Sequence, residues 1–427
     1  MPLQRSLYPW YVVGVLMLAF VLSFADRYIL GLLTIALQRD LGLTPTQLSL
    51  LIGPGFVIPF VLAGLPIARL ADRYSRRRII ILSLLFWSLA TLGCAFARDF
   101  SQLLLMRALV GAGEAALAPA AYSLIVDYFA PERRASALST FSVGTYAGSG
   151  LAFTLGGAII AYTAKAPATA DWQSWQLVFM SLGLCGLLLS PLLLSLREPP
   201  RAAQHQALPL AALRTQLWQR RRVLLHHHLG FALLSLAGSA AVAWVPAYFI
   251  HSFGWPPGRF GLAYGGIIAL CGSAGLLCAG ALADRAWRSG QRDAALRLAG
   301  NAALGSATLG LLYLLMPDAR LSLLMMLPSA FLSAMPFGLA VASLQELMPA
   351  TMRAQASALY ALITNLVGLG LGPLAVTWLS HQLFGDEQAL GKALLTVIGS
   401  TQLLAAICLH SGRKAYREAL EHRAAPT

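Results

Sequence analysis

Long apolar runs separated by short polar segments extend along almost the whole chain. A bilayer core needs about 20 apolar residues per helix, and runs of this length recur from one end of the sequence to the other. The pattern predicts twelve spanning helices, at residues 9–35, 46–69, 79–97, 101–127, 136–163, 174–196, 223–250, 259–283, 296–316, 321–346, 355–380 and 389–410. We therefore expect an all-α membrane protein.

The two halves of the chain resemble each other. Asp72–Arg73 follows the second predicted helix and Asp284–Arg285 follows the eighth, and the same spacing relates Gly53 to Gly265. An internal repeat of six helices predicts two six-helix bundles related by a pseudo-two-fold axis. The expected domains are an N-terminal bundle at 1–196, a cytoplasmic linker with an interfacial helix at 197–222, a C-terminal bundle at 223–412 and a cytoplasmic tail at 413–427.

Composition and charge agree with a membrane protein. Hydrophobic residues make up 58% of the chain and charged residues 11%, whereas a soluble domain has about 25% charged residues. With the N-terminus placed in the cytoplasm, 23 of the 31 Lys and Arg fall in cytoplasmic segments and 6 in external loops. This positive-inside pattern predicts an inner (plasma) membrane protein with both termini cytoplasmic. The net charge of +14 therefore indicates contact with anionic lipids rather than with nucleic acid.

Charged side chains lie deep in only two of the predicted helices. The first helix contains Asp26 and Arg27, and the fourth contains Arg107 and Glu114. At 1.5 Å per residue, Asp26 lies roughly 12 Å and Arg107 roughly 9–10 Å from the external face. A charge in hydrocarbon costs about 2.5–3.5 kcal/mol, so such residues mark ion or substrate pathways by default. We expect the four to share a cavity and a proton; a purely structural pair of salt bridges is the alternative.

Other polar residues provide no catalytic or metal site. The chain has no His-Glu-x-x-His, Gly-x-Ser-x-Gly or Walker motif, and its five cysteines fall inside apolar runs. We therefore expect no enzyme activity, no cofactor and no metal. His226–His228 opens the seventh helix. Consecutive residues of a helix point in different directions, so these histidines predict an interfacial belt rather than a metal site.

Charged residues also gather at the cytoplasmic ends of the helices. Asp72 lies in the first exposed turn after the second helix, where it can bond to a neighbouring helix. A gate that opens and closes needs bonds of this kind. The residues expected to form the gate are Asp72, Arg73, Arg76, Arg134, Asp284 and Arg285.

Two of these regions carry the motifs of a known transporter family. The signature Gly-x-Leu-x-Asp-Arg-x-Gly-Arg-Arg aligns with Ala68–Arg77, where both glycines are replaced, and the repeat copy at Gly280–Arg285 restores the first glycine. Arg107-x-x-x-Gly111-x-x-Glu114-Ala115 matches the fourth-helix pattern of the same family. On these motifs the chain resembles the major facilitator superfamily over essentially its whole length. The resemblance implies two bundles that transport by alternating access.

Within the superfamily the chain is most similar to the spinster branch. The similarity lies in Phe24–Tyr28, Gly111–Ala115 and Asp127–Arg134. Members of that branch move lysophospholipids and sphingoid lipids. The resemblance therefore implies a lipid-like substrate, and it makes proton-coupling and head-group residues of Asp26, Arg27, Arg107 and Glu114.

The distribution of polar residues also favours an amphiphilic substrate. The buried charges all lie in the first half, whereas the second half contributes mainly aromatic and neutral polar groups. The expected cavity lining is Tyr146, Ser239, Trp244, Phe337, Tyr360 and Asn365. We expect a monomer with a small amphiphile and a proton as its ligands. Symport of small carboxylates and drug export are the alternatives. Antiport is not supported, because Gly148-Ser149-Gly150 lacks the proline of the antiporter signature.

Overall fold

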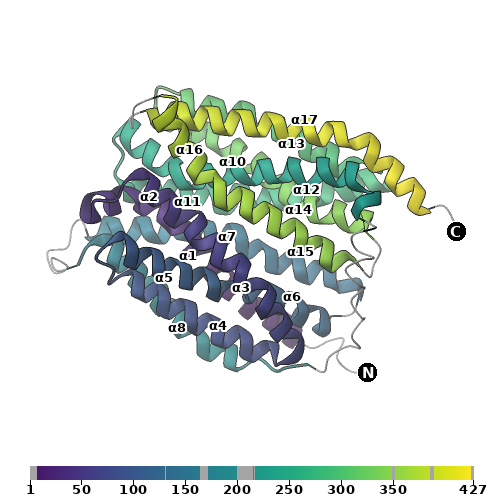
Figure 1. Cartoon of the computed structure of the whole chain (residues 1–427), viewed down its shortest axis with the longest axis horizontal. Helices are drawn as coiled ribbons and strands as arrows, with labels where there is room; N and C mark the ends of the chain where they lie inside the picture. The colour runs from purple at the N-terminus through teal and green to yellow at the C-terminus, as the bar shows by residue number, and fades with distance from the viewer. Residues whose placement is uncertain are drawn as a thin grey trace. The chain divides into compact units, whose positions relative to one another are not determined.

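The computed structural model describes residues 7–129, 131–163, 172–199, 215, 217–348, 352–384 and 389–424. Within these residues the chain is helical and forms no strand (Figure 1). Twelve helices or helix pairs are long and apolar enough to cross a membrane, so the predicted all-α membrane fold is confirmed. The elements are α1 (Tyr8–Leu41), α2 (Pro45–Ile52), α3 (Pro54–Arg73), α4 (Arg76–Cys94), α5 (Phe100–Glu114), α6 (Leu117–Tyr128), α7 (Pro131–Thr163), α8 (Ser174–Leu194), α10 (Arg221–Phe253), α11 (Pro257–Ile267), η3 (Ile268–Gly272), α12 (Ser273–Arg288), α13 (Ala294–Leu315), α14 (Ala319–Leu347), α15 (Arg353–Thr364), η5 (Asn365–Gly370), α16 (Leu371–Gln382) and α17 (Leu390–Ala424).

Four of the predicted spans are interrupted. A break at Gly53 separates α2 from α3, and a turn after Glu114 separates α5 from α6. The turn has a local cause, because Pro119 has no N–H to bond the carbonyl of Ala115 and its ring crowds that carbonyl. Short π-helices, η3 and η5, join α11 to α12 and α15 to α16. Pro373 likewise removes the helical partner of the Leu369 carbonyl in η5.

The chain divides into two compact units. Unit 1 comprises residues 1–203 and 249–269, and unit 2 comprises residues 204–248 and 270–427. The segment 249–269, assigned from the sequence to the C-terminal bundle, therefore clusters with unit 1. In unit 1, α1 packs on α7 and α8, while α5 packs on α3 and α4. The amphipathic part of the linker lies mostly outside the described residues.

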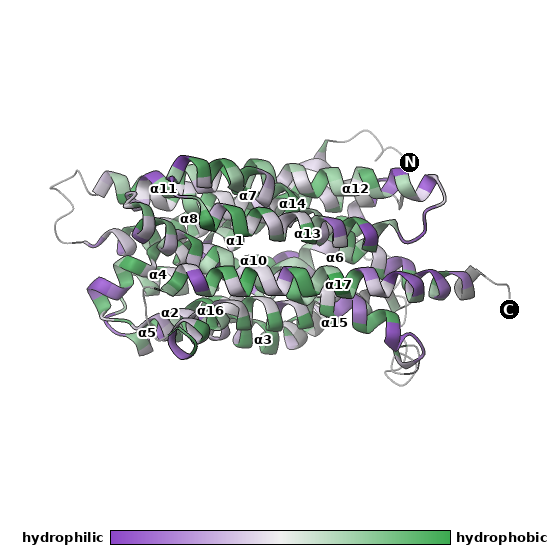
Figure 2. Cartoon of the chain, turned by 90° about the horizontal axis from the view of Figure 1, so that it is seen from above, coloured by the Kyte–Doolittle hydropathy of each residue, from purple (hydrophilic) through white to green (hydrophobic). Residues whose placement is uncertain are grey.

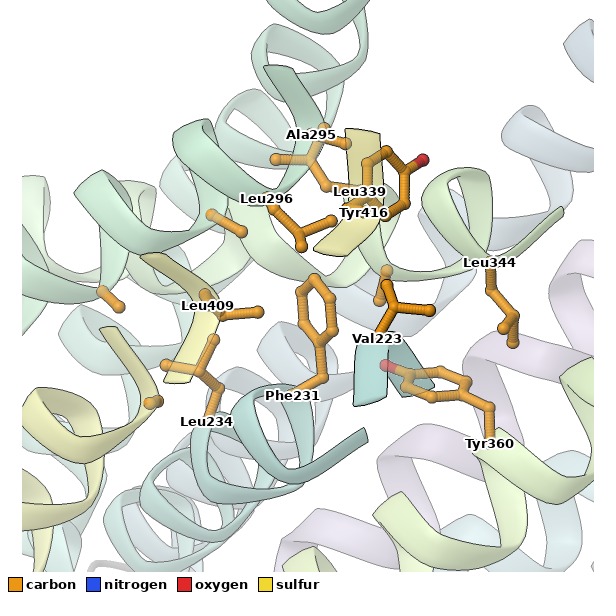
Figure 3. Close-up of a cluster of buried hydrophobic side chains, with 14 of the residues drawn as sticks. Val223, Phe231, Leu234, Ala295, Leu296, Leu339, Leu344, Tyr360, Leu409 and Tyr416 are labelled. Carbon is orange, nitrogen blue, oxygen red and sulfur yellow. The ribbon is translucent and has the colours of Figure 1, made fainter. Parts of the chain in front are cut away.

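The core of unit 2 joins several of its helices. Phe231 of α10, Leu296 of α13, Leu339 of α14 and Leu409 of α17 belong to one cluster of buried side chains (Figure 3). Helix α13 packs against both α14 and α17 (Figure 1). These contacts bury part of each helix, while other positions carry exposed apolar residues such as Leu324 of α14, which is 52% exposed. An apolar outer surface is what a lipid environment favours.

Helix α17 continues beyond the expected end of the last span. Its 35 residues rise about 52 Å at 1.5 Å per residue, which exceeds the thickness of the bilayer core. The C-terminal turns are hydrophilic (Figure 2), yet they join the packing of unit 2. Tyr416 is completely buried, and Arg413 Nε lies 2.7 Å from Asp293 Oδ2. The segment after residue 412, expected as a tail, is thus helical as far as Ala424.

A pair of glycines in α12 provides a test of the packing in unit 2. A Cβ added at Gly275 would lie 2.9 Å from the carbonyl carbon of Phe331 in α14, whereas a Cβ at Gly280 would meet nothing within 4 Å. We expect Gly275→Ala to lower the thermal unfolding midpoint of the purified protein, because overpacking costs about 1–3 kcal/mol. Gly280→Ala, the control, should leave the midpoint unchanged or raise it, because alanine favours a helix by about 1 kcal/mol. Equal midpoints for the two variants would contradict the close approach of α12 to α14.

Candidate functional site

Two buried ion pairs connect α1 to α5 in unit 1. Arg107 Nη1 lies 3.0 Å from Asp26 Oδ1, and Arg27 Nη2 lies 2.8 Å from Glu114 Oε2. The most exposed of the four residues, Arg27, is only 7% exposed, and Arg107 is fully buried. The structure therefore brings together all four charged residues that the sequence placed inside the membrane. Their formal charges balance in two pairs.

Hydroxyl groups donate further hydrogen bonds to the two acids. Ser23 Oγ donates to Glu114 Oε2 at 2.7 Å, and the Thr91 hydroxyl donates to Asp26 Oδ2. The sequence analysis missed both hydroxyls. Ser23 precedes Arg27 by four residues and so lies on the same face of α1, a spacing that could have identified it. Thr91 comes from α4, and no sequence signal connects it to Asp26.

Aromatic rings surround the two arginines. The Cζ atom of Arg27 lies 4.7, 4.9 and 5.1 Å from the ring centroids of Phe24, Phe56 and Phe60. Arg107 Cζ lies 5.1 Å from the ring of Phe56. Cations at these distances are attracted to the faces of aromatic rings, by about 2 kcal/mol or more where water is excluded. The site thus combines positive charge with an apolar wall.

Gly111 allows α3 to pack close to α5. It lies one helical turn after Arg107, and a Cβ at this position would collide with the backbone of Phe56, 3.1 Å from its carbonyl carbon. The collision would push α3 away from α5 and remove the ring of Phe56 from the arginines. The glycine in the Arg107-to-Glu114 motif therefore positions an aromatic side chain of the site.

Several polar atoms of the site have no hydrogen-bond partner among the described residues. They are Arg27 Nε, Arg107 Nε, Arg107 Nη2 and Glu114 Oε1, and all are buried. A buried polar atom without a partner costs about 1–3 kcal/mol, and more when it is charged. A salt bridge that only fixed helix register would be more stable with these atoms satisfied. The pattern therefore favours a site that accepts a proton, water or a polar ligand.

A second charged cluster lies at the N-terminus of α4. Arg76 is 3% exposed and bonds to Asp127 and to Glu198, whose Oε1 lies 2.9 Å from Arg76 Nε. Burial would raise the pKa of the Glu198 carboxyl, but the backbone N–H of Arg77, the Arg76 guanidinium and the Ser75 hydroxyl donate to it and hold that pKa below its ordinary value. A carboxylate is also favoured at a helix N-terminus.

The other residues expected at the gate do not join this cluster within the described part of the chain. The side chains of Asp72 and Arg73 lie outside the described set. Arg134 Nε donates to the carbonyls of Val126 and Phe129 at 3.1 and 3.0 Å. In unit 2, Asp284 and Arg285 are exposed on α12. The role of all six residues as a gate stays a prediction.

The residues expected to line the cavity have varied surroundings. Trp244 is buried and its Nε1 donates to the Pro373 carbonyl at 3.1 Å. Phe337 is 40% exposed, whereas Ser239 and Tyr360 are buried. Asn365 begins η5, and Tyr146 is half-buried on α7. Their role in binding a substrate stays a prediction.

The histidine run has a different position from the one expected. His227 is fully buried and His228 is 8% exposed, so the prediction of an interfacial belt is wrong for these two. His227 Nε2 lies 3.0 Å from the Ala340 carbonyl and 3.0 Å from Ser343 Oγ. Both partners belong to α14, on the face that α10 packs against. An apolar helix that contains a histidine gives no signal of which face will be buried.

Comparison with known proteins identifies the family. Residues 16–373 match the model of the Major Facilitator Superfamily, and the chain belongs to that superfamily. An MFS-type efflux pump of Mycolicibacterium smegmatis is 31% identical over 420 residues, which cover 96% of this chain and 93% of that protein. Human protein spinster homolog 1 is 31% identical over 251 residues, 56% of this chain and 46% of that protein. The chain thus spans about half the length of its spinster relative.

Solved structures agree on the fold. A bacterial homolog of the human lysosomal transporter Spinster, crystallised in an inward-facing and unoccupied conformation, has a TM-score of 0.78 with 24% identity over 97% of both chains. A D-xylose-proton symporter has a TM-score of 0.70 with 17% identity. The match to human protein spinster homolog 1 confirms the predicted resemblance to the spinster branch. The chain is an integral, multi-pass membrane protein of a superfamily of secondary transporters.

The Asp26–Arg107 pair predicts strongly coupled stability effects. Arg107→Met leaves the carboxylate of Asp26 buried without its cation, which costs about 3–5 kcal/mol. We expect a large fall in the thermal unfolding midpoint for this variant, and a partial recovery when Asp26→Asn is added. Midpoint losses that simply add in the double variant would show that the pair is not coupled in the folded protein.

The cluster around Glu198 predicts a pH-dependent stability. A carboxyl whose pKa is lower in the folded than in the unfolded protein contributes stability above its unfolded pKa of about 4.3, and this stability is lost as pH falls through the folded pKa. Glu198→Gln should therefore lower the unfolding midpoint at about pH 7, and its effect should shrink as pH falls from about 4 through the lowered pKa of the folded protein. Glu418→Gln, an exposed change on α17, is the control. A deficit that stays the same as pH falls through this range would contradict the lowered pKa.

Proposed function

We propose that the protein couples proton movement to the transport of a small amphiphile with a charged head group, of the lysophospholipid or sphingoid class. The observation that carries the proposal is the buried cluster of Asp26, Arg27, Arg107 and Glu114, in which acid and base atoms have no partner among the residues that the structure describes. A transporter with alternating access needs a site whose charge changes during the cycle. An acid in contact with an arginine provides such a site.

Glu114 is the proposed proton carrier. Its Oε2 atom accepts bonds from Ser23 and Arg27, whereas Oε1 has no partner among the described residues. A proton placed on Oε1 neutralises the carboxylate and weakens its attraction for Arg27. The guanidinium then becomes available to an anionic group of the substrate. Loss of the proton restores the ion pair and displaces that group, so proton and substrate occupancy are linked.

Arg107 is the proposed head-group anchor. It keeps Nη1 on Asp26 while Nε and Nη2 have no partner in the described part of the chain. These two donors are parallel in a guanidinium and suit a carboxylate or phosphate. The ring of Phe56 lies against the same guanidinium and offers an apolar surface next to the charge. The combination favours an amphiphile, in agreement with the lipid substrates that the spinster resemblance implies.

Efflux of an amphiphilic compound is the second candidate function. It is favoured by the match to an MFS-type efflux pump along 96% of this chain, whereas the match to the spinster homolog covers 56%. Both functions use the same charged site and differ in the direction and identity of the cargo. The distribution of Lys and Arg supports an inner-membrane location with cytoplasmic termini, and the expected state is a monomer.

Glu114→Gln tests the proton coupling. In proteoliposomes with an imposed pH gradient, we expect the variant to lose proton-driven uptake by about tenfold or more, while exchange of labelled substrate without a gradient persists. The labelled probes are a lysophospholipid, a sphingoid base and a small carboxylate. Glu418→Gln serves as the control. Wild-type gradient-driven uptake in Glu114→Gln would exclude the carrier role, and uptake of the carboxylate alone would exclude the lipid-like substrate.

A further inference from the structure

The outer face of the first turns of α10 carries basic and apolar side chains together. Arg221 and Arg222 begin the helix and are exposed, and Leu225 and Leu229 are 65% and 45% exposed. These positions are three, four and seven residues apart, so they lie on one side of the helix. The other side faces the core of unit 2, where Val223 belongs to the buried cluster (Figure 3). None of these residues takes part in the proposed transport site.

The two arginines have no carboxylate partner in the described part of the chain. Among the described residues of unit 2, the ion pair joins Arg413 to Asp293 instead. The sequence contains no Asp or Glu at residues 199–283, so neither α10 nor the segment before it supplies a counter-ion. Arg76 at the start of α4, by contrast, pairs with Glu198. The positive charge at the start of α10 therefore remains available to an anion outside the protein.

An exposed tryptophan lies against one of the arginines. Trp218 is 68% exposed, and the Arg221 Cζ atom lies 4.7 Å from its ring centroid. Arg221 Nη1 also donates to the Trp218 carbonyl at 3.2 Å. Tryptophan is enriched at the boundary between lipid head groups and hydrocarbon. The contact therefore places a guanidinium at the level where the phosphates of the bilayer lie.

The order of these side chains along the helix axis matches the order of groups in a phospholipid. The 33 residues of α10 rise about 50 Å, whereas the hydrocarbon core is about 30 Å thick, so the ends of the helix extend into the head-group regions. Leu225 and Leu229 follow Arg222 by roughly 4.5 and 10.5 Å along the axis. A phosphate beside the arginines thus brings the glycerol and the upper acyl chain beside the leucines.

We propose that the outer face of α10 at Arg221, Arg222, Leu225 and Leu229 binds one anionic phospholipid. The two guanidinium groups donate to the lipid phosphate, and the leucines contact an acyl chain. A zwitterionic head group fits less well, because its ammonium meets two cations and no carboxylate among the described residues of this face. The ligand is a resident lipid of unit 2 and not the transported amphiphile, whose proposed anchor, Arg107, lies in unit 1.

Quenching of Trp218 fluorescence tests the site without reference to transport. The full chain is placed in nanodiscs of phosphatidylcholine with a rising fraction of brominated phosphatidylglycerol, and Trp218→Phe supplies the signal of the other tryptophans. We expect half-maximal quenching at a lower fraction of brominated phosphatidylglycerol than of brominated phosphatidylcholine. Arg222→Gln, which leaves the contact of Arg221 with Trp218 in place, should raise the fraction of brominated phosphatidylglycerol about fivefold, because a basic side chain near the membrane surface contributes about this factor to the attraction of anionic lipid.

The control is Arg288→Gln, which removes the same charge from an exposed position on α12 in the same unit. Trp218 of this variant should be quenched as in the wild type, because the site depends on local contact and not on net charge. Equal half-quenching fractions for the two brominated lipids would show ordinary lipid contact and overturn the proposal. A shift in Arg288→Gln as large as that in Arg222→Gln would overturn it too.

Native mass spectrometry provides an independent count of the bound lipid. The protein is released from micelles that contain phosphatidylglycerol, and the lipids that remain attached are counted. We expect Arg221→Gln/Arg222→Gln to retain one phosphatidylglycerol fewer per molecule than the wild type, and Arg288→Gln to retain the same number. A double variant that retains as much phosphatidylglycerol as the wild type would contradict the site.

Discussion

The burial of four charges between α1 and α5 is the constraint on which unit 1 depends. Arg107 is fully buried, and an isolated charge at such a depth is costly in a bilayer. The cost is offset only when Asp26 lies beside it, and Arg27 depends on Glu114 in the same way. The two pairs fix both the register and the rotation of α1 relative to α5.

The neighbouring helices contribute residues that pack around the two ion pairs. Gly111 lets α3 bring Phe56 against both guanidinium groups, and Thr91 extends from α4 to Asp26. The turn caused by Pro119 begins directly after Glu114, where a straight helix would continue. Donor and acceptor atoms without a partner among the described residues remain in the middle of this packed arrangement. Packing that is so specific would not leave them unsatisfied if stability were its only purpose.

The sequence predicts the charged site better than it predicts the residues around it. Asp26 and Arg27 point about 100° apart on a helix, which is why they bind different partners, and depth along the helices brings Asp26 to the level of Arg107. These arguments work because a charge in an apolar run has few allowed positions. A serine, threonine or histidine has many, so Thr91 and His227 became identifiable only once the packing was known. The π-helices η3 and η5 similarly leave no mark in hydropathy.

The two units handle polarity in different ways, although the sequence repeats between them. Unit 1 holds permanent charges that must remain paired. A ligand that displaces one member of an ion pair must therefore take its place beside the other member. Helix α10 in unit 2 carries a neutral buried group instead, because His227 contacts the Ala340 carbonyl and the Ser343 hydroxyl. Exchange of partners is therefore obligatory in unit 1, whereas a neutral group such as His227 needs no counter-ion.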